Sequence, residues 1–399
     1  MKNFISASDV TNIQQLVDNA LKYKLNPFLD GHLGKGKRIG LLFLNPSLRT
    51  RLSTQVAAAN LGMEAIVFNV DKEGWALEFQ EGAVMNGTTV EHIKDAAPVL
   101  GQYFDVLAIR TFPTLKNKAE DYSEMFIKQF IRFAGVPVVS LESATLHPLQ
   151  SLTDIITIQE LLKNAAAYKP KVVLSWAPHI KPLPQCVANS FAQWVNAWGG
   201  ANFVITHPEG YELDEQFTNG ATVIHDQAEA LNNADFVYVK NWSSYEQYGQ
   251  QLSSDTSWML TNEKLAITND AKVMHCLPVR RNIELSDEIL DGPNSLVTQQ
   301  AGNRVWAAQA VLAEGHELEP YGLQLVARFP HVGALRAALL PPRRRRRGRW
   351  PDRHQRDHAG TAAGDHRAGA GAAVRPDGVG RERVRNHRRA HARAVPAAG

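Results

Sequence analysis

The chain has 399 residues, 44% of them hydrophobic and 21% charged, which fits two ordinary globular domains. Its two cysteines, Cys186 and Cys276, are far apart, so we expect a reducing compartment, the cytoplasm, rather than a disulfide scaffold. The sequence has no apolar run of about 20 residues, no secretory signal at its start and no clustered His/Cys ligand set, so we expect no membrane span, no secretory peptide and no metal.

The net charge of +3 conceals an asymmetry along the chain. Residues 1–315 carry a net charge of −8, whereas residues 316–399 carry +11 and contain 18 arginines and no lysine. The basic character therefore belongs to the C-terminal stretch, and the overall charge says nothing about what the rest of the chain binds.

Apolar patterning predicts helices and strands in alternation. A helix begins the chain after Ser6, and continuous apolar runs predict buried strands at residues 39–44, 65–70, 106–109, 136–141, 172–176, 203–206, 236–239 and 273–276. Helical stretches lie between most of them, at residues 53–61, 91–101, 121–133, 153–163, 183–198 and 225–232. This alternation predicts the α/β class, with two doubly wound domains, each built on a parallel sheet.

The domain boundary is expected near residue 150, where a helix at 151–163 would join the two halves. We expect a first domain at 1–150, a second at 151–314 and an Arg/Ala/Gly-rich tail at 315–399, with the last helix of the second domain beginning near Asn303. The tail is either a basic disordered segment that binds nucleic acid or the product of a shifted reading frame beyond a truncated final helix. We favour the second interpretation because Arg, Ala, Gly and Pro are encoded by GC-rich codons, and the nucleotide sequence would decide it.

The first chemically informative motif is Ser47-Leu48-Arg49-Thr50-Arg51. It follows a predicted strand and an Asn45-Pro46 turn, and it leads into a predicted helix. The free N–H groups at a helix start attract anions, and hydroxyl and guanidinium donors would strengthen the attraction. The motif therefore predicts a phosphate site. The alternative is an ordinary serine cap with surface arginines.

Three further polar segments follow predicted strands. They are Arg110, His147-Pro148-Leu149-Gln150 and His275-Cys276-Leu277-Pro278. Ligands of open α/β sheets bind beyond the carboxyl ends of the strands, so all four segments are expected at one site.

The motifs SLRTR, HPLQ and HCLP, the last followed by Arg280 and Arg281, resemble those of the carbamoyltransferase family, which includes the aspartate and ornithine transcarbamylases. The resemblance covers residues 1–314. It implies a first domain for carbamoyl phosphate, a second for the amino-acid acceptor, a last helix that returns to the first domain, and a homotrimer with shared active sites. It implies no metal or organic cofactor.

The resemblance also implies roles for individual residues. The residues expected to bind carbamoyl phosphate are Ser47, Leu48, Arg49, Thr50, Arg110, His147, Gln150, Cys276, Leu277 and Arg304. Among them, the residues expected to act in catalysis are Arg49, Thr50, Arg110 and His147. The residues expected to bind the acceptor are Trp75, Val90, Glu142, His179, Lys240, Cys276, Leu277 and Arg280.

The acceptor is expected to be an acylated ornithine. The Ser-Met-Gly segment that is typical of ornithine transcarbamylases is missing, and Lys240 would repel a free α-ammonium group. Trp75 and the proline-rich stretch at residues 176–184 resemble the acylornithine branch of the family; the alternative for Trp75 is plain core packing. At Val90 the acetyl branch has a glutamate, which would repel a succinyl carboxylate. The alternative is that Val90 only packs its loop.

We therefore predict carbamoyl transfer to the side-chain amine of N-succinyl-L-ornithine, a step of arginine biosynthesis, with N-acetyl-L-ornithine as the alternative acceptor. Lys181 or the cations of the Val90 loop could pair with the succinyl carboxylate. An alternative of another class is nucleic-acid binding by the basic tail on an inactive transferase body; we expect no nucleic acid and no membrane as partners.

Overall fold

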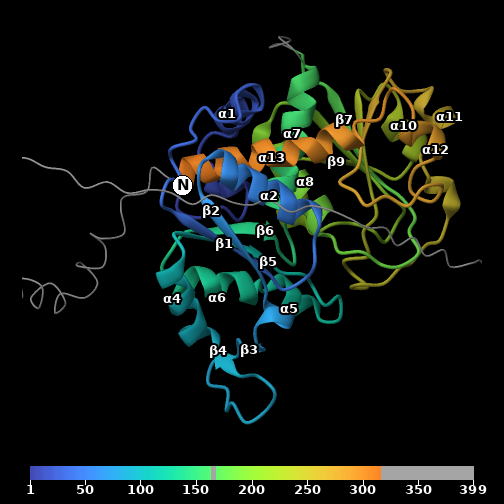
Figure 1. Cartoon of the computed structure of the whole chain (residues 1–399). Coiled ribbons are helices and arrows are strands. Elements are labelled where there is room, and N and C mark those ends of the chain that lie inside the picture. Colours follow the sequence, from blue (N-terminus) through green and yellow to red (C-terminus); the bar gives the residue numbers. More distant parts are fainter. Residues whose placement is uncertain (163–167, 316–399) are drawn as a thin grey trace, which may run out of the picture. The chain divides into compact units, whose positions relative to one another are not determined.

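The computed structural model describes residues 1–162 and 168–315, which belong to one compact unit (Figure 1). The tail at residues 316–399 and the end of the helix predicted at 151–163 lie outside the described residues. None of the helices among the described residues is long and apolar enough to cross a membrane.

A four-stranded parallel sheet occupies the first half of the chain. Its strands are β1 (Arg38–Phe43), β2 (Glu64–Asn69), β5 (Val106–Arg110) and β6 (Val138–Glu142), in the order β2-β1-β5-β6. Phe43 lies opposite Arg110, and Arg110 lies opposite Glu142. The carboxyl ends of three adjacent strands therefore meet at one edge, which brings sequence segments about a hundred residues apart into contact.

A five-stranded parallel sheet follows. It consists of β7 (Lys171–Trp176), β8 (Asn202–Thr206), β9 (Thr222–Ile224), β10 (Phe236–Lys240) and β11 (Lys272–Met274), in the order β11-β10-β7-β8-β9. Trp176 lies opposite Lys240, again at carboxyl ends. The predicted fold class, two parallel sheets flanked by helices, is confirmed; the short edge strand β9 was not predicted.

Long helices pack together beside the sheets. α1 (Ile13–Leu25), α2 (Arg49–Asn60) and α7 (Pro148–Leu161) all contact α13 (Val297–Glu314), the orange helix in Figure 1. Gln309 on α13 accepts a hydrogen bond from Asn60 Nδ2 and donates one to the Pro27 carbonyl. The buried face of α13 carries small apolar residues such as Ala307, Ala308 and Ala310, which let this helix pack closely.

The remaining elements are shorter or lie on the periphery. They are α3 (Val70–Glu73), β3 (Leu77–Glu78), β4 (Glu91–His92), α4 (Ile93–Tyr103), α5 (Lys118–Tyr122), α6 (Met125–Phe133), α8 (Cys186–Trp198), α9 (Glu215–Thr218), α10 (Gln227–Leu231), α11 (Asn262–Leu265), α12 (Asp287–Leu290) and the 3-10 helices η1 (Ala7–Asp9) and η2 (Thr256–Trp258). The strands β3 and β4 pair with each other in a loop that projects away from the first sheet (Figure 1).

Several predicted helix boundaries were wrong. The last helix begins at Val297 rather than near Asn303, because Gln300 in its first turn is buried and binds the His275 backbone and Asp154. The helix predicted at 121–133 is two helices, α5 and α6, separated at Glu124, whose backbone is left-handed with φ 52°.

Candidate active site

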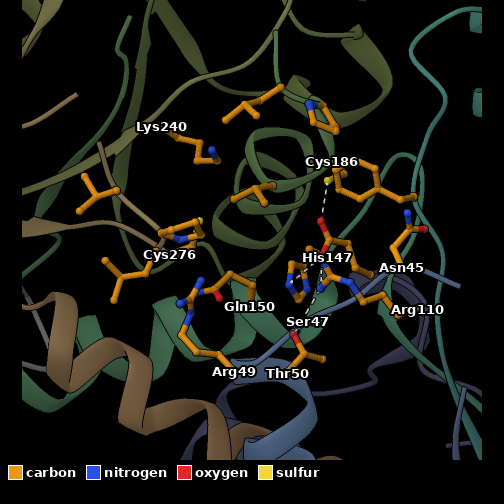
Figure 2. A pocket seen from close by; sticks show the side chains of 18 of the residues that line it. Asn45, Ser47, Arg49, Thr50, Arg110, His147, Gln150, Cys186, Lys240 and Cys276 are labelled. Carbon is orange, nitrogen blue, oxygen red and sulfur yellow. Dashed lines mark hydrogen bonds and ion pairs between the residues drawn. The ribbon is translucent and has the colours of Figure 1, made fainter. Parts of the chain in front are cut away.

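A cavity of about 620 Å³ lies at the carboxyl ends of the strands of both sheets. It is lined by Asn45, Pro46, Ser47, Arg49, Thr50, Arg110, Phe112, Glu142, His147, Gln150, His179, Lys181, Leu183, Pro184, Cys186, Val187, Lys240, Cys276, Leu277, Pro278, Val279, Arg280 and Arg304. Figure 2 shows Arg49, Thr50, Arg110 and His147 on one side of this cavity, with Lys240 across from them. The four strand-end segments therefore meet at one site, as their positions predicted.

The start of α2 forms one wall of the cavity. The residue before the helix is Leu48, and no side chain caps the helix start. The N–H groups of the first turn are therefore available to an anion in the cavity. Thr50, only 2% exposed, accepts hydrogen bonds from Arg304 Nη2 at 2.6 Å and Arg110 Nη1 at 3.4 Å.

Three guanidinium groups converge on this helix start. Burial lowers the pKa of Arg49. Burial also lowers the pKa of Arg304, to about 10, so Arg304 remains charged at neutral pH. The Nε atoms of Arg49, Arg110 and Arg304 are buried and have no partner in the part of the chain that the structure describes. Such an excess of buried positive charge favours a multiply charged anion at this wall.

Glu142 at the end of β6 is the carboxylate nearest to these cations. Its Oε2 lies 2.5 Å from Arg110 Nη1 and 3.6 Å from His147 Nε2. The Cys186 thiol donates to Glu142 Oε1 at 3.4 Å, and burial holds its pKa well above the ordinary value. One carboxylate thus fixes Arg110 toward the cavity without neutralising the whole cluster.

His147 is a buried neutral imidazole. It lies directly before α7, and its pKa is held well below the ordinary value by burial and by the charges of Arg304 and Arg110. Its Nδ1 atom has no partner among the described residues. A neutral imidazole in this position can donate one hydrogen bond to a substrate oxygen.

A buried network holds Gln150 at the cavity. Gln150 Nε2 and Gln300 Nε2 each donate to Asp154 Oδ1 at 2.7 Å, and Gln300 Oε1 accepts from the His275 backbone N–H at 2.9 Å. Burial raises the pKa of Asp154 to about 7. Gln150 Oε1 also contacts Arg304 Nη1. The network therefore links α7, α13 and the loop after β11.

The opposite wall comes from the second sheet. Lys240 at the end of β10 is 7% exposed, and it forms no ion pair with a carboxylate among residues 1–162 and 168–315. A buried ammonium group of this kind favours an anionic ligand. Burial raises the pKa of the Cys276 thiol, so the thiol stays protonated at neutral pH.

The loop after β11 is fixed by hydrogen bonds on the side that faces away from the cavity. His275 Nε2 donates to Glu284 Oε1 at 3.2 Å, and the Leu277 N–H donates to His275 Nδ1 at 2.9 Å. Burial opposes ionisation of Glu284, but the hydrogen bond and charge of His275, the charge of Lys240 and the Arg280 N–H hold its pKa at about 2. His275 thus positions Cys276 and Leu277 without lining the cavity itself.

Three predicted site residues do not line the cavity of their own chain. Leu48 is 70% exposed, Trp75 55% and Val90 63%, so the core-packing alternative for Trp75 is wrong. Trp75 Nε1 donates to Glu91 Oε2 at 2.8 Å and the Val90 N–H donates to the Ala76 carbonyl, so both residues lie on the projecting loop at β3 and β4.

Other lining residues were not predicted as site residues. They include Asn45, Phe112, Leu183, Cys186, Val187 and Val279. Asn45 and Phe112 follow the ends of β1 and β5, so the strand-end argument could have found them. Leu183 lies in the proline-rich stretch at residues 176–184, which the family resemblance had singled out. Cys186 and Val187 begin α8, for which the sequence offers no such signal.

Comparisons with known proteins agree with this geometry. Residues 2–160 match the family described as aspartate/ornithine carbamoyltransferase, carbamoyl-P binding domain, and residues 185–314 match its Asp/Orn binding domain. The chain is 47% identical over 314 residues to an N-succinylornithine carbamoyltransferase of Bacteroides fragilis, covering 78% of this chain and 98% of the relative. It is 34% identical over 332 residues to an N-acetylornithine carbamoyltransferase of Xylella fastidiosa, with the same coverage.

Solved structures are similar as well. An acetylornithine transcarbamylase complexed with acetylcitrulline is 34% identical, with a TM-score of 0.75 over 79% of this chain and 99% of that one. A mutant N-acetyl-L-ornithine transcarbamylase complexed with carbamyl phosphate and N-succinyl-L-norvaline is 34% identical over the same share of both chains and also has a TM-score of 0.75.

Proposed function

The chain belongs to the aspartate/ornithine carbamoyltransferase family, and on this basis we propose that it carbamoylates the side-chain amine of N-succinyl-L-ornithine in arginine biosynthesis. Carbamoyl phosphate is the donor, and the products are N-succinyl-L-citrulline and phosphate. The observation that carries the proposal is the convergence of Arg49, Arg110 and Arg304 on an uncapped helix start.

Carbamoyl phosphate binds with its phosphate at the start of α2. Ser47, Arg49 and Arg304 donate to the phosphate oxygens, together with the first N–H groups of the helix. The carbamoyl oxygen then faces Thr50, Arg110 and His147, which all line the adjacent wall. Gln150 and the loop at Cys276 and Leu277 take the carbamoyl amide.

The acceptor amine attacks the carbamoyl carbon, and a carbon–nitrogen bond forms as the bond to the phosphate oxygen breaks. Negative charge on the carbamoyl oxygen is stabilised by Thr50, Arg110 and His147, and one such donor typically contributes ~3 kcal/mol. A lysine-like amine must first lose a proton, which costs roughly 4–5 kcal/mol at neutral pH. The surrounding guanidinium groups offset part of this cost, and this first proton goes to solvent. The departing phosphate takes the second proton, which the nitrogen loses once it has bonded to the carbamoyl carbon.

Lys240 and Arg280 select the acceptor. Both line the wall across from the helix start, where they bind the α-carboxylate of an acylated ornithine. A free α-ammonium group would face the buried ammonium of Lys240, which is unfavourable. The 47% identity to an N-succinylornithine enzyme, against 34% to an N-acetylornithine enzyme, supports the succinyl acceptor. Lys181 also lines the cavity, and in this proposal it pairs with the second carboxylate of the succinyl acceptor.

A neighbouring subunit completes the site. Trp75 and Val90 are exposed on the projecting loop and do not line the cavity of their own chain, and in a cytoplasmic homotrimer they would reach the acyl group in the next subunit. An exposed apolar stripe that runs from the residue before α2 along that helix supports such an assembly: Leu48, Leu52 and Val56 recur at four-residue spacing and are 70%, 52% and 47% exposed.

Mixing two variants tests the shared site, with the acceptor far below its KM so that each variant alone is nearly inactive. Lys240→Met removes a residue of the chain's own cavity, and Trp75→Ala removes the residue lent to the neighbour. Random trimers formed after mixing equal amounts should recover up to about a quarter of the wild-type activity, because one site in four combines two intact contributions. Recovery that stays at the level of the unmixed variants contradicts a shared site.

Initial-rate kinetics with separate acceptors test the reaction. We expect the highest kcat/KM with N-succinyl-L-ornithine, a lower value with N-acetyl-L-ornithine and the lowest with free ornithine. Val90→Glu should lower kcat/KM for the succinyl acceptor by roughly tenfold or more, since the added carboxylate repels the succinyl carboxylate, and should spare the acetyl acceptor. A preference for free ornithine would show that the role given to Lys240 is wrong.

A further inference from the structure

Three side chains that commonly bind metals gather outside the cavity, at the edge of the second sheet. His207 follows β8, His225 follows β9, and Glu212 lies in the connection between them. One ligand atom from each of the three lies within 4.8 Å of the others. None of them lines the active-site cavity, so the reaction proposed above does not use them.

The sheet register explains why the two histidines meet. β8 and β9 are parallel neighbours, and Thr206 pairs with Ile224. The residues that directly follow this pair, His207 and His225, therefore lie side by side. Their rings are 5.0 Å apart between centroids and nearly perpendicular, at 81°.

Hydrogen bonds to carbonyl oxygens orient both rings and select their tautomer. His207 Nδ1 contacts the Pro208 carbonyl at 2.8 Å, and His225 Nδ1 contacts the His207 carbonyl at 3.1 Å. A carbonyl oxygen can only accept, so in the neutral form of each ring Nδ1 carries the hydrogen and Nε2 has the lone pair that a metal needs. Metal-binding histidines are commonly oriented in this way, with the other ring nitrogen donating to a carbonyl or carboxylate.

We propose that His207, Glu212 and His225 bind a divalent cation of the zinc class. Two imidazoles and one carboxylate suit zinc, whereas magnesium and calcium prefer oxygen ligands alone. Ligand atoms around a tetrahedral zinc ion lie ~3.3 Å apart, given bond lengths of about 2.0–2.1 Å. Glu212 and His225 are exposed and can move inward by the small distance needed, and a water takes the fourth position.

The site is structural. β9 has only three residues, forms the edge of the sheet and is largely exposed. A cation held by His225 on one side and by His207 and Glu212 on the other fastens this edge to β8. The centroid of the His207 ring also lies 6.1 Å from that of Trp242, which is two residues beyond Lys240. A cation bound to His207 would therefore also stabilise the end of β10, where Lys240 lines the cavity.

Zinc titration of the full-length chain tests the proposal. The variants are His225→Gln and Glu212→Gln, and the matched control is His32→Gln, which removes an exposed histidine outside the cluster. The histidines of residues 316–399 are present in every protein and cancel in the comparison. Isothermal calorimetry gives the number of sites and their affinity, and the thermal unfolding midpoint is measured with and without zinc chloride.

We expect the wild type and His32→Gln to bind one more zinc ion per chain than His225→Gln, and to gain several degrees in unfolding midpoint. Glu212→Gln should weaken that site by at least ~10-fold. Without zinc, His225→Gln should keep the wild-type rate of carbamoyl transfer, which shows that it is folded and separates this test from that of the reaction. Equal zinc binding by wild type and His225→Gln overturns the proposal, as does an equal stabilisation by magnesium chloride.

Discussion

Replacing Thr50 by valine is the most informative single change at the active site. Thr50 Oγ1 accepts hydrogen bonds from Arg304 and Arg110, and guanidinium groups can only donate. The one hydrogen of the hydroxyl is therefore left for a ligand in the cavity. Valine has nearly the same shape but removes both this donor and the acceptor that orients the two arginines.

The expected loss of activity is large and the expected loss of stability is small. Removing one donor to a developing oxyanion lowers kcat by roughly 10²–10³-fold, or about 3–4 kcal/mol in activation free energy. The buried Arg304 donor loses one partner, which lowers the free energy of unfolding by about 1–3 kcal/mol. Arg304 keeps its contact with Gln150, so we expect the fold to persist.

Steady-state citrulline formation with saturating substrates measures the effect, and thermal unfolding checks the fold. Thr50→Ser retains the hydroxyl and should keep kcat within about tenfold of the wild type. A folded Thr50→Val enzyme whose kcat stays within a few-fold of the wild type would refute the role of this hydroxyl. So would a serine variant as impaired as the valine variant.

Three further predictions concern other parts of the site. Lys240→Met should raise the KM for N-succinyl-L-ornithine by about 30-fold, because a hydrogen bond to a buried charge contributes ~2 kcal/mol. The KM for carbamoyl phosphate should stay nearly unchanged, and initial rates with each substrate varied in turn measure both KM values. Glu124 accepts hydrogen bonds from Ser143 and Thr145 beside His147, so Glu124→Gln should lower kcat by roughly tenfold with little change in either KM; an equal rise in KM would argue against a positioning role. Burial raises the pKa of Asp154 to about 7 from 3.8, so the folded state binds this proton more tightly, and the resulting stability is full below about pH 4 and is lost as the pH rises through 7. Asp154→Asn should therefore flatten the fall in unfolding midpoint between about pH 4 and pH 7, and parallel curves for the two proteins would contradict this.

The arrangement of strands could be predicted from the sequence because each buried parallel strand is a continuous apolar run. Helix starts were predicted less well, because they depend on distant partners. Gln300 looks like a surface residue in the sequence, yet it is buried in α13 against Asp154 and the His275 backbone. Likewise, the break between α5 and α6 occurs where Glu124 turns to bind residues 143–145.

The first wall of the cavity could be predicted because its residues follow strands that end at one edge of a sheet. Arg304 comes from a helix, and only the family resemblance placed it there; the structure brings it within 2.6 Å of Thr50. Buried partners such as Asp154 and Glu284 carry no local sequence signal, since their importance lies in contacts with residues far along the chain. The pair of His207 and His225 was also missed, because neither belongs to a recognisable motif and only the strand register brings them together.

One competition experiment tests the central claim most directly. The enzyme is given isotopically labelled carbamoyl phosphate and an equimolar mixture of N-succinyl-L-ornithine, N-acetyl-L-ornithine and free ornithine, and the products are separated by mass. We predict that most of the label enters N-succinyl-L-citrulline, with one phosphate released for each labelled product. Release of phosphate without any labelled citrulline, or label mainly in free citrulline, would contradict the account.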